Sequence, residues 1–375
     1  MMLMMMSDQE VWAPPPSLAH LPRAQWPQIS PYAWNLRDLP PPAPDAPTVL
    51  STFSCGGGSS MGYKLAGCRM LGAVDIDPRM MALYVDNLHP PVHMIGSITE
   101  VAENPALIKS WAGVDILDGS PPCTTFSVAG PREKAWGKAR KYAEGAVEQV
   151  LDRLFFDYLD LVEVLHPKVF IAENVPGMLV GRARRYVKAI ITQARALGYD
   201  VQLWDLWASD YGSPQARRRI FFVGRRRDLG LDPFDLPAPI LPKVTVADAV
   251  YDLIDSGTDQ DFTLSDRARV FWNMARPGED GDAYISPYDG KTLGFSQMKL
   301  PWLGQASTIV SSCASYFHPQ KKRFMSIPEL MRLGGFPDDY RGLDNRSVAM
   351  RVIGMSVPPQ LMKAVVGSVI DRMAG

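Results

Sequence analysis

The alternation of hydrophobic and polar positions along the chain predicts an α/β fold with a mixed, mostly parallel sheet. From Val49 onward, short segments rich in β-branched and aromatic residues alternate with segments of helical periodicity. The clearest helix is predicted at 144–165, where apolar residues recur at a spacing close to 3.6. The same pattern predicts strands at 48–53, 70–76, 114–117, 169–172, 201–207 and 219–223, and helices beginning at Pro78 and covering 184–197, 326–333 and 359–373.

Two stretches of the chain do not follow this alternation of strands and helices. Residues 1–48 are rich in proline, which cannot sustain helices or sheet ladders, so they are predicted to form an arm that aromatic residues such as Trp34 could dock on the surface. Residues 228–304 are rich in Pro, Gly and Asp and are predicted to form a small separate lobe. The main domain is therefore expected at 49–227, with a segment at 305–375 that returns to complete it.

Composition and charge narrow the class of protein. No apolar run approaches the roughly 20 residues of a membrane span, so we expect a cytosolic chain without membrane association. A net charge of -1 argues against nonspecific coating of nucleic acid. Local basic clusters could nevertheless hold one phosphate backbone, although a single cluster is more often a solvated surface. These clusters lie at 132–141, 182–188, 217–219, 225–227 and 321–323.

A lone cysteine follows two prolines in the segment Gly119-Ser-Pro-Pro-Cys123. Because the prolines fix the backbone and remove two donors, the thiol is presented on a rigid turn. This favours a nucleophile over the alternative, a small buried hydrophobe. The four cysteines show neither paired spacing nor nearby histidines, so no metal site and no disulfide framework is predicted; they are Cys55, Cys68, Cys123 and Cys313.

A glycine-rich turn, 53–62, follows the first predicted strand and opens a helix. Such turns let a cofactor approach backbone amides, but the spacing matches neither the dinucleotide fingerprint nor a phosphate-binding loop. Asp75 ends the second strand, where doubly wound folds place a carboxylate for ribose hydroxyls. The alternative is that Asp75 caps the helix that begins at Pro78.

Taken in order, these segments resemble the DNA cytosine-5 methyltransferases. The resemblance implies a Rossmann-like domain that depends on S-adenosylmethionine, with 228–304 as the target-recognition lobe. The resemblance covers residues 49–227 and 305–370, approximately. It is specific because the matching segments occur together in the family's order, whereas no single motif would identify the family. The matching segments are Thr52-Phe-Ser-Cys-Gly-Gly-Gly58, Val74-Asp-Ile-Asp77, Pro121-Pro-Cys123, Glu173-Asn-Val175, Gln215-Ala-Arg-Arg-Arg219, the stretch 323–340 and Ile353-Gly-Met-Ser-Val-Pro-Pro359.

The resemblance also assigns roles to residues. The Cys123 thiolate adds to C6 of a flipped-out cytosine, Glu173 hydrogen-bonds N3 and the exocyclic amine, and Arg217 and Arg219 lie beside the base and its phosphate. Positioning of the substrate falls to Ser127, Asn174 and Gln215, and the segment 127–142 is expected to act as a lid. Cofactor contacts are implied for Phe53, Ser54, Cys55, Gly57, Gly58, Asp75, Ile76, Ser97, Ile98, Pro122, Leu154, Met355 and Ser356.

The partners implied by the resemblance are S-adenosylmethionine and double-stranded DNA. A monomer in a bacterial or phage-infected cytoplasm is expected, with a cognate restriction endonuclease as a genetic partner.

Several positions depart from the family's usual residues, mostly around the cofactor. They are Ser51 for Asp, Cys55 for Gly, Asp75 for Glu, Ser97 for Asp, Thr124 for Gln and Met355 for Asn. Three alternatives therefore stay open. The donor could be a modified S-adenosylmethionine that delivers a group larger than methyl, although no new cation is evident to bind it. The substrate could be tRNA, with which Ser120 is compatible. The chain could also be a non-catalytic DNA-binding relative, against which the retention of Cys123 and Glu173 argues.

Overall fold

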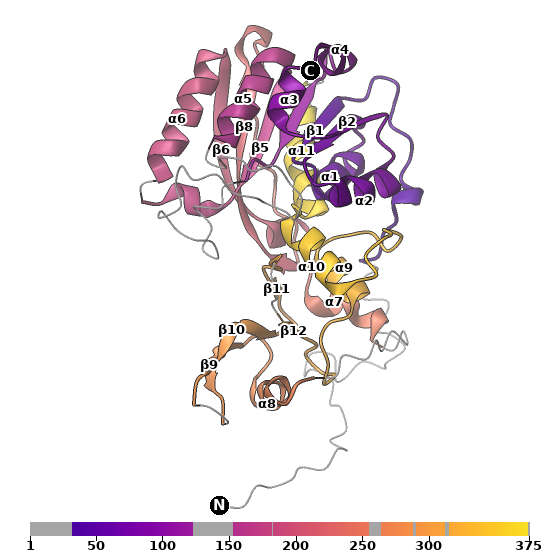
Figure 1. Ribbon diagram of the computed structural model, residues 1–375, viewed down its shortest axis with the longest axis vertical. Helices are drawn as coiled ribbons and strands as arrows, with labels where there is room; N and C mark the ends of the chain where they lie inside the picture. The colour runs from indigo at the N-terminus through magenta and orange to yellow at the C-terminus, as the bar shows by residue number, and fades with distance from the viewer. Residues whose placement is uncertain are drawn as a thin grey trace, which may run out of the picture.

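The computed structural model describes residues 32–122, 153–181, 183–254, 264–287, 290–311 and 315–373. Its main body is a seven-stranded sheet between two layers of helices (Figure 1). The strand order is β3-β2-β1-β4-β5-β8-β6, and β8 runs antiparallel to both of its neighbours. The strands are β1 (Thr48–Thr52), β2 (Arg69–Asp75), β3 (Val92–Ile95), β4 (Ile116–Gly119), β5 (Val169–Asn174), β6 (Tyr199–Trp207) and β8 (Arg218–Arg226). This arrangement confirms the predicted fold class.

Helices cover both faces of the sheet because its central strands are apolar on both sides. All four residues 169–172 of β5 are completely buried, as expected for a parallel strand between helical layers. On one face pack α3 (Ile98–Ala102), α5 (Leu154–Leu165) and α6 (Ala183–Ala196), with α4 (Pro105–Ser110) nearby. On the other face lie α1 (Gly58–Leu65) and α11 (Pro359–Met373), and next to them α2 (Pro78–Leu88), α9 (Ile327–Leu333) and α10 (Arg346–Met355) (Figure 1).

Most predicted elements agree with the observed ones to within two residues, and the last helix coincides at both ends. The strand predicted at 219–223 extends three residues further, to Arg226. Of the helix predicted at 144–165, the structure describes the part from Leu154, since 123–152 lie outside the described residues. The elements β3, α3, α4 and α10 were not predicted. The first three have four, five and six residues, too few to give a clear periodicity, whereas α10 has ten residues and was missed.

The stretch Arg346–Met373 is long and apolar enough to cross a membrane by length and composition alone. It consists of the two helices α10 and α11, which the segment Ser356-Val357-Pro358 separates. The apolar faces of these helices are buried in the main body, where Val352 and Leu361 are inaccessible to solvent. The stretch therefore belongs to the core.

The small lobe has a core of its own. Its sheet is β12-β10-β9, and α8 packs against it through Phe271, which contacts Phe317 at a ring distance of 5.2 Å. The lobe continues past residue 304, because β12 pairs with β10. Conversely, α7 lies within the range predicted for the lobe but packs on α9 of the main body. The elements are α7 (Val246–Val250), α8 (Asp266–Met274), β9 (Asp280–Ile285), β10 (Thr292–Lys299) and β12 (Ser315–Phe317), while β7 (Gln215–Ala216) pairs with β11 (Ala306–Ser307).

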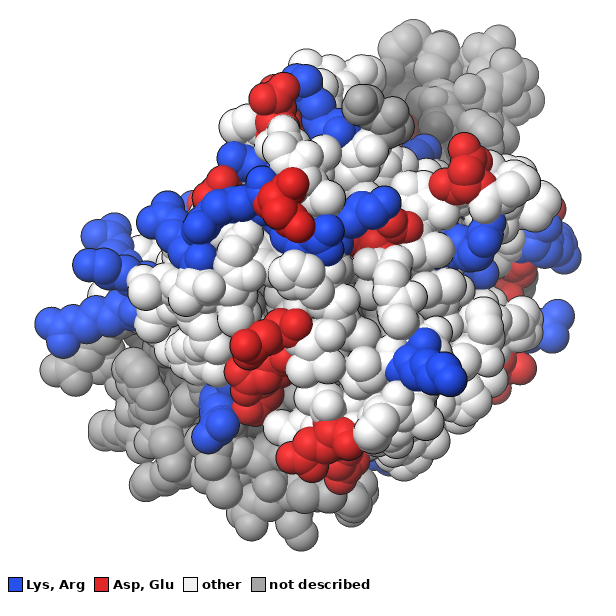
Figure 2. Space-filling model, turned by 90° about the horizontal axis from the view of Figure 1, so that it is seen from above, with Lys and Arg blue, Asp and Glu red and all other residues white. Residues whose placement is uncertain are grey.

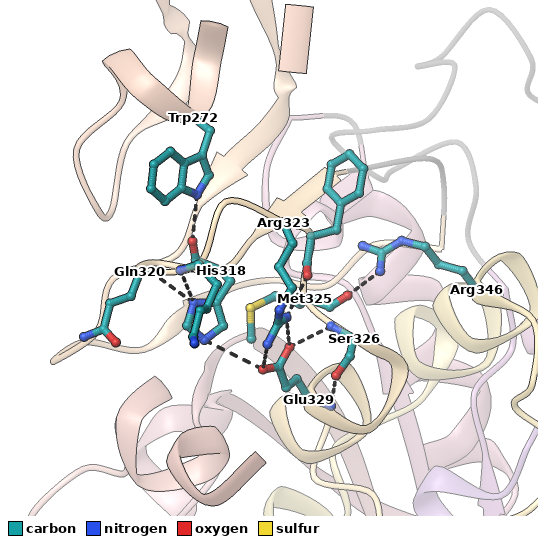
Figure 3. Close-up of polar contacts among 10 residues, drawn as sticks. Trp272, His318, Gln320, Arg323, Met325, Ser326, Glu329 and Arg346 are labelled. Carbon is teal, nitrogen blue, oxygen red and sulfur yellow. Dashed lines mark hydrogen bonds and ion pairs between the residues drawn. The ribbon is translucent and has the colours of Figure 1, made fainter. Parts of the chain in front are cut away.

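A buried polar network joins this lobe to the main body (Figure 3). Glu329 at the start of α9 accepts two hydrogen bonds from Arg323, at 2.7 and 2.8 Å, and lies 3.7 Å from His318. Trp272 of α8 donates to the His318 carbonyl at 3.1 Å. Burial lowers the pKa of His318 to about 4, despite the opposing charge of Glu329, so the imidazole is neutral at physiological pH.

The end of the proline-rich segment docks on the main body. Trp34 donates from Nε1 to the Gly335 carbonyl at 3.1 Å, and Asp339 accepts from the backbone of Leu36 and Arg37. Residues 1–31 lie outside the described residues.

Candidate active site

The predicted site residues gather at one edge of the sheet, where β1, β2, β4 and β5 end. Because these four strands are parallel, their carboxyl ends meet there, and the segments that follow them lie at the same edge of the sheet, where open α/β sheets bind ligands. The structure describes the chain that follows β4 as far as Pro122. Cys123 and Ser127 lie outside the described residues, so their predicted roles stay predictions.

Glu173 and Arg219 form an ion pair at this edge. Glu173 lies near the end of β5 and Arg219 near the start of the antiparallel β8, which places both side chains at the same end of the sheet. Arg219 Nε is 2.5 Å from Glu173 Oε1, in a contact that is an ion pair rather than a well-directed hydrogen bond. Their side chains are 13% and 12% exposed, so a small opening reaches a largely desolvated charge pair.

Asn174, next along β5, ties the segment before Cys123 to the site. Its Nδ2 donates to the carbonyl of Pro121 at 3.0 Å, while its Oδ1 accepts from the backbone of Val175 at 2.9 Å. Asn174 is buried, so both bonds are protected from water. The side chain thus fixes the distance between the end of β5 and the proline turn.

Arg217 and Gln215 turn inward. Arg217 is 2% exposed and donates to the carbonyls of Ile309 and Gly354 at 3.0 and 2.9 Å. Burial and the neighbouring Arg219 lower its pKa well below the usual value, and Glu173 partly offsets them. Gln215 donates to the carbonyl of Leu333 and accepts from the backbone of Ile309. Both side chains hold distant segments behind the site, and their direct contacts with substrate stay predictions.

Asp75 occupies the position expected of a ribose ligand. It accepts hydrogen bonds from the backbone of Cys55 at 2.7 Å and of Asp77 at 2.8 Å. The helix cap is Asp77, which accepts from the backbone of Arg79, so the alternative that Asp75 caps α2 is wrong. Burial raises the pKa of Asp75 to about 6, although the two hydrogen bonds oppose the shift.

The glycine-rich turn has three residues in the left-handed region, Phe53, Cys55 and Gly57, with φ of 52°, 45° and 88°. Cys55 adopts a conformation that favours glycine, the residue that the family usually has there. Its thiol is buried, and burial together with the charge of Asp75 raises its pKa to about 12. The backbone amide of Cys55 in this turn donates to Asp75, and the turn leads directly into the N-terminus of α1, a setting that fits a nucleoside cofactor with an anionic tail.

The remaining predicted cofactor residues lie around this turn or pack beneath it. Ser97 caps α3 and accepts from the backbone of Thr99 at 3.3 Å, so its hydroxyl already serves the fold. Ser356 donates to the carbonyl of Val352 at 2.7 Å. Ile98 and Leu154 are buried in the core, at 4% exposure each, Met355 ends α10, and Ser54 donates to the carbonyl of Val74. Direct contacts with the cofactor stay predictions for all the predicted cofactor residues, including Phe53, Gly57, Gly58, Ile76 and Pro122.

One buried carboxyl at this edge was not identified from the sequence. Asp118 of β4 is 2% exposed and accepts from Ser51 Oγ at 2.7 Å and from the Tyr63 hydroxyl at 3.3 Å. The available signal was a charged residue directly after the apolar pair Ile116 and Leu117 at the end of a predicted strand.

The basic cluster 225–227 lies at the opposite end of the sheet. Figure 2 looks onto this end and shows Lys and Arg side chains interleaved with acidic ones. Arg225 and Arg227 pair with Asp200 at 3.4 and 3.0 Å, and Arg226 pairs with Asp228 at 2.7 Å. This cluster is a paired surface away from the site. Within the described ranges, no group of three His, Cys, Asp or Glu side chains could hold a metal ion.

Comparison with known proteins decides the family. The sequence model of the family of C-5 cytosine-specific DNA methylases matches residues 48–371, which include nearly the whole main body and the lobe. The chain is an enzyme of the C-5 cytosine-specific DNA methylase family. Members of this family transfer a methyl group from S-adenosylmethionine to C5 of cytosine.

Individual relatives agree with this assignment. The chain is 28% identical over 342 residues to the Type II methyltransferase M.NgoPII of Neisseria gonorrhoeae, an alignment of 84% of this chain and 92% of the relative. It is 29% identical to M.XorII of Xanthomonas oryzae pv. oryzae, over 87% and 85% of the two chains. Among solved structures, a protein described as a DNA modification methyltransferase encoded within a prophage (E. coli) has a TM-score of 0.70 at 23% identity, covering 88% of this chain and 100% of that one. It shows the same fold.

Proposed function

We propose that this C-5 cytosine methylase acts on double-stranded DNA through a covalent bond between Cys123 and cytosine C6. The observation that carries the proposal is the Glu173 and Arg219 ion pair, 2.5 Å apart, at the sheet edge to which Asn174 ties the segment that leads to Cys123. A carboxyl group and a cation at one desolvated opening suit a base whose ring gains charge during attack.

The chemistry requires these residue types. Addition of the thiolate to C6 forms a carbon–sulfur bond and turns C5 into a nucleophile, while Glu173 supplies a proton to N3. S-adenosylmethionine supplies the electrophilic methyl group when bound. A base then removes the C5 proton, and the thiolate leaves C6, which restores the ring. Because C6 is shielded within a stacked duplex, the cytosine must first rotate out of the helix into the site, as for other enzymes that modify a base in DNA.

The described residues suit S-adenosylmethionine itself. Asp75 presents a partly buried carboxylate that accepts from the backbone of Cys55, which fits a ligand of ribose hydroxyls. Among the described residues, Arg351 is a cation near this turn, and it is already paired with Asp77 at 2.8 Å. A modified donor with an added anionic group would need an uncommitted cation. We therefore propose that the transferred group is methyl.

The sequence relatives compared above are Type II methyltransferases, which supports DNA over tRNA as the substrate and supports a cognate restriction endonuclease as a genetic partner. A monomeric enzyme in a bacterial or phage-infected cytoplasm is proposed on the same ground. The target sequence would be read by the small lobe around α8 and β10.

The proposal is tested with duplex DNA libraries that contain 5-fluorocytosine, incubated with purified protein and S-adenosylmethionine. Fluorine at C5 cannot leave as a proton, so the enzyme should remain bonded to the DNA after denaturation. The Cys123→Ser variant should give no such adduct, and methylome sequencing of cells that express the chain should show 5-methylcytosine in one sequence context. Absence of an adduct on every sequence context, with methylation found only on tRNA, would overturn the proposal.

A further inference from the structure

The glycine-rich turn between β1 and α1 is fastened to β2 by hydrogen bonds. The amide and the hydroxyl of Ser54 both donate to the carbonyl of Val74, each at 3.1 Å. The amide of Cys55 donates to Asp75 at 2.7 Å, and the amide of Gly57 returns to the carbonyl of Ser54 at 2.9 Å. These bonds fix the turn from the side of the sheet.

Tyr340 fastens the same turn from the C-terminal part of the main body. Its hydroxyl donates to the carbonyl of Gly56 at 2.7 Å, and the residue is 5% exposed. A Cβ at Gly56 would lie 2.9 Å from this hydroxyl and 2.5 Å from Cγ1 of Val352, so the turn lies directly against both residues. Burial raises the pKa of Tyr340, so the hydroxyl keeps its proton and remains a donor.

The turn needs this support because of Cys55. This residue has a φ of 45°, a left-handed conformation that costs an L residue free energy and persists only where its surroundings hold it. The two bonds flank it, since Asp75 holds its own amide and Tyr340 holds the carbonyl of the next residue. Its side chain is buried in the same apolar cluster as Tyr340. Without the Tyr340 hydroxyl, Cys55 should relax toward negative φ, and the amides that follow it should move.

The loop that carries Tyr340 is in turn held by the end of the proline-rich arm. The amide of Asp338 donates to the carbonyl of Trp34 at 2.9 Å, and Trp34 Nε1 donates to the carbonyl of Gly335 at 3.1 Å. Asp339, directly before Tyr340, accepts from two further backbone amides of the arm at 2.8 and 3.1 Å. The end of the arm and the loop thus form one hydrogen-bonded unit.

We propose that Tyr340 is a positioning residue for the cofactor turn, which it keeps in the conformation that binds S-adenosylmethionine, and that the end of the arm holds Tyr340 in place. The inference rests on the proposed function, because it takes S-adenosylmethionine as the ligand of this turn. Tyr340 acts through the backbone of Gly56 and Cys55. The arm, which lies before the residues that the family model matches, thereby takes part in cofactor binding.

The test compares Tyr340→Phe, which removes the hydroxyl and keeps the ring, with Tyr199→Phe as the matched control. Tyr199 is also buried and donates to the carbonyl of Pro167 at 2.6 Å, but at the opposite end of the sheet. In calorimetric titrations without DNA, Tyr340→Phe should raise the Kd for S-adenosylmethionine about three- to tenfold, and Tyr199→Phe should leave it within about 1.5-fold. Trp34→Phe removes one bond of the arm and should raise the Kd by less.

A readout without cofactor is the reaction of Cys55 with a thiol reagent in the native protein, followed by mass spectrometry of the modified peptide. Because this thiol is buried, its modification reports opening of the turn. Tyr340→Phe should speed modification of Cys55 about three- to tenfold. Cys68, which is also buried, is the internal reference and should react at an unchanged rate.

Cys55→Gly distinguishes positioning of the turn from a general loss of stability. Glycine adopts positive φ without steric cost, so in the Cys55→Gly background Tyr340→Phe should raise the Kd less than about twofold. An unchanged Kd for folded Tyr340→Phe, or the same loss in both backgrounds, overturns the inference. If Tyr340→Phe fails to fold, an unchanged Kd and an unchanged Cys55 reactivity for Trp34→Phe overturn it. Formation of the 5-fluorocytosine adduct by the wild type separates these outcomes from failure of the proposed function.

Discussion

Asn174 and Pro121 are joined by a buried hydrogen bond of 3.0 Å, from the side-chain amide of the first to the carbonyl of the second. These residues are 53 positions apart in sequence and lie at the ends of adjacent strands. Because Asn174 directly follows Glu173, this one bond links the position of the proline turn to that of Glu173.

Replacing Asn174 by Asp removes the donor and keeps the acceptor for Val175. The segment before Cys123 should then shift, and since errors of about 1 Å in a reacting geometry cost about 10²-fold, methylation should slow by about that factor. The Kd for S-adenosylmethionine, measured by calorimetry, should change little. Asn87→Asp is the matched control, because Asn87 makes a comparable pair of bonds to Leu83 and Arg341 on the surface. A rate within about threefold of wild type for Asn174→Asp would contradict the positioning role.

Adjacent arginines on β8 should differ in their effect on catalysis. Arg219→Ala removes the cation that faces Glu173 at 2.5 Å and should slow adduct formation at least about 10²-fold. Arg218→Ala should stay within a few-fold of wild type, since Arg218 points to the other face, where it pairs with Asp205. Equal losses in the two variants, measured as adduct yield over time, would show that the ion pair has no special role.

Cofactor affinity should fall as pH falls through the pKa of Asp75, about 6. The ionised carboxylate is the form that accepts ribose hydroxyls, so below that pH the Kd should rise by up to about tenfold per pH unit. Asp75→Asn should abolish this dependence, whereas Asp86→Asn on the exposed side of α2 should retain it. Calorimetric titrations at several pH values provide the measurement.

The raised pKa of Asp75 also affects the stability of the fold, in the opposite direction: lower pH weakens cofactor binding but favours the folded state. Because folding raises the pKa of this carboxyl from 3.8 to about 6, the folded state binds the proton more tightly than the unfolded state. The contribution of Asp75 to the free energy of unfolding is therefore greatest below about pH 4 and declines as pH rises to about 6. Urea unfolding of Asp75→Asn should lack this decline.

Two helical glycines should respond differently to alanine. At Gly58 a Cβ would lie 2.5 Å from Ser356 Cβ and 2.7 Å from the Val357 carbonyl, so Gly58→Ala should push α1 from α11 and cost about 1–3 kcal/mol. At Gly367 of α11 no atom lies within 4 Å, so Gly367→Ala should raise the free energy of unfolding by about 0.5–1 kcal/mol. Denaturant unfolding of both variants checks the pair, and equal losses would contradict the packing argument.

The sequence predicted the elements whose signal is local. Long strands buried on both faces, the capped helix that begins at Pro78 and the final helix follow from periodicity and turn chemistry, and the ordered motifs indicated where cofactor and base would lie. The partners of Arg217 could not be predicted, because the carbonyls it binds are 92 and 137 residues away. The hydrogen bond between Ser51 and Asp118 could not be predicted for the same reason, because it joins residues 67 positions apart on neighbouring strands.

The packing of α1 against α11 has a consequence for how the enzyme is made. The glycine-rich turn leads into α1, whose residues Gly58 and Gly62 lie against the start of α11 about 300 positions later. A ribosome must therefore translate nearly the whole chain before the first helix of the sheet gains its permanent neighbour. The packing of α1 on α11 is therefore completed only after that last helix has been synthesised.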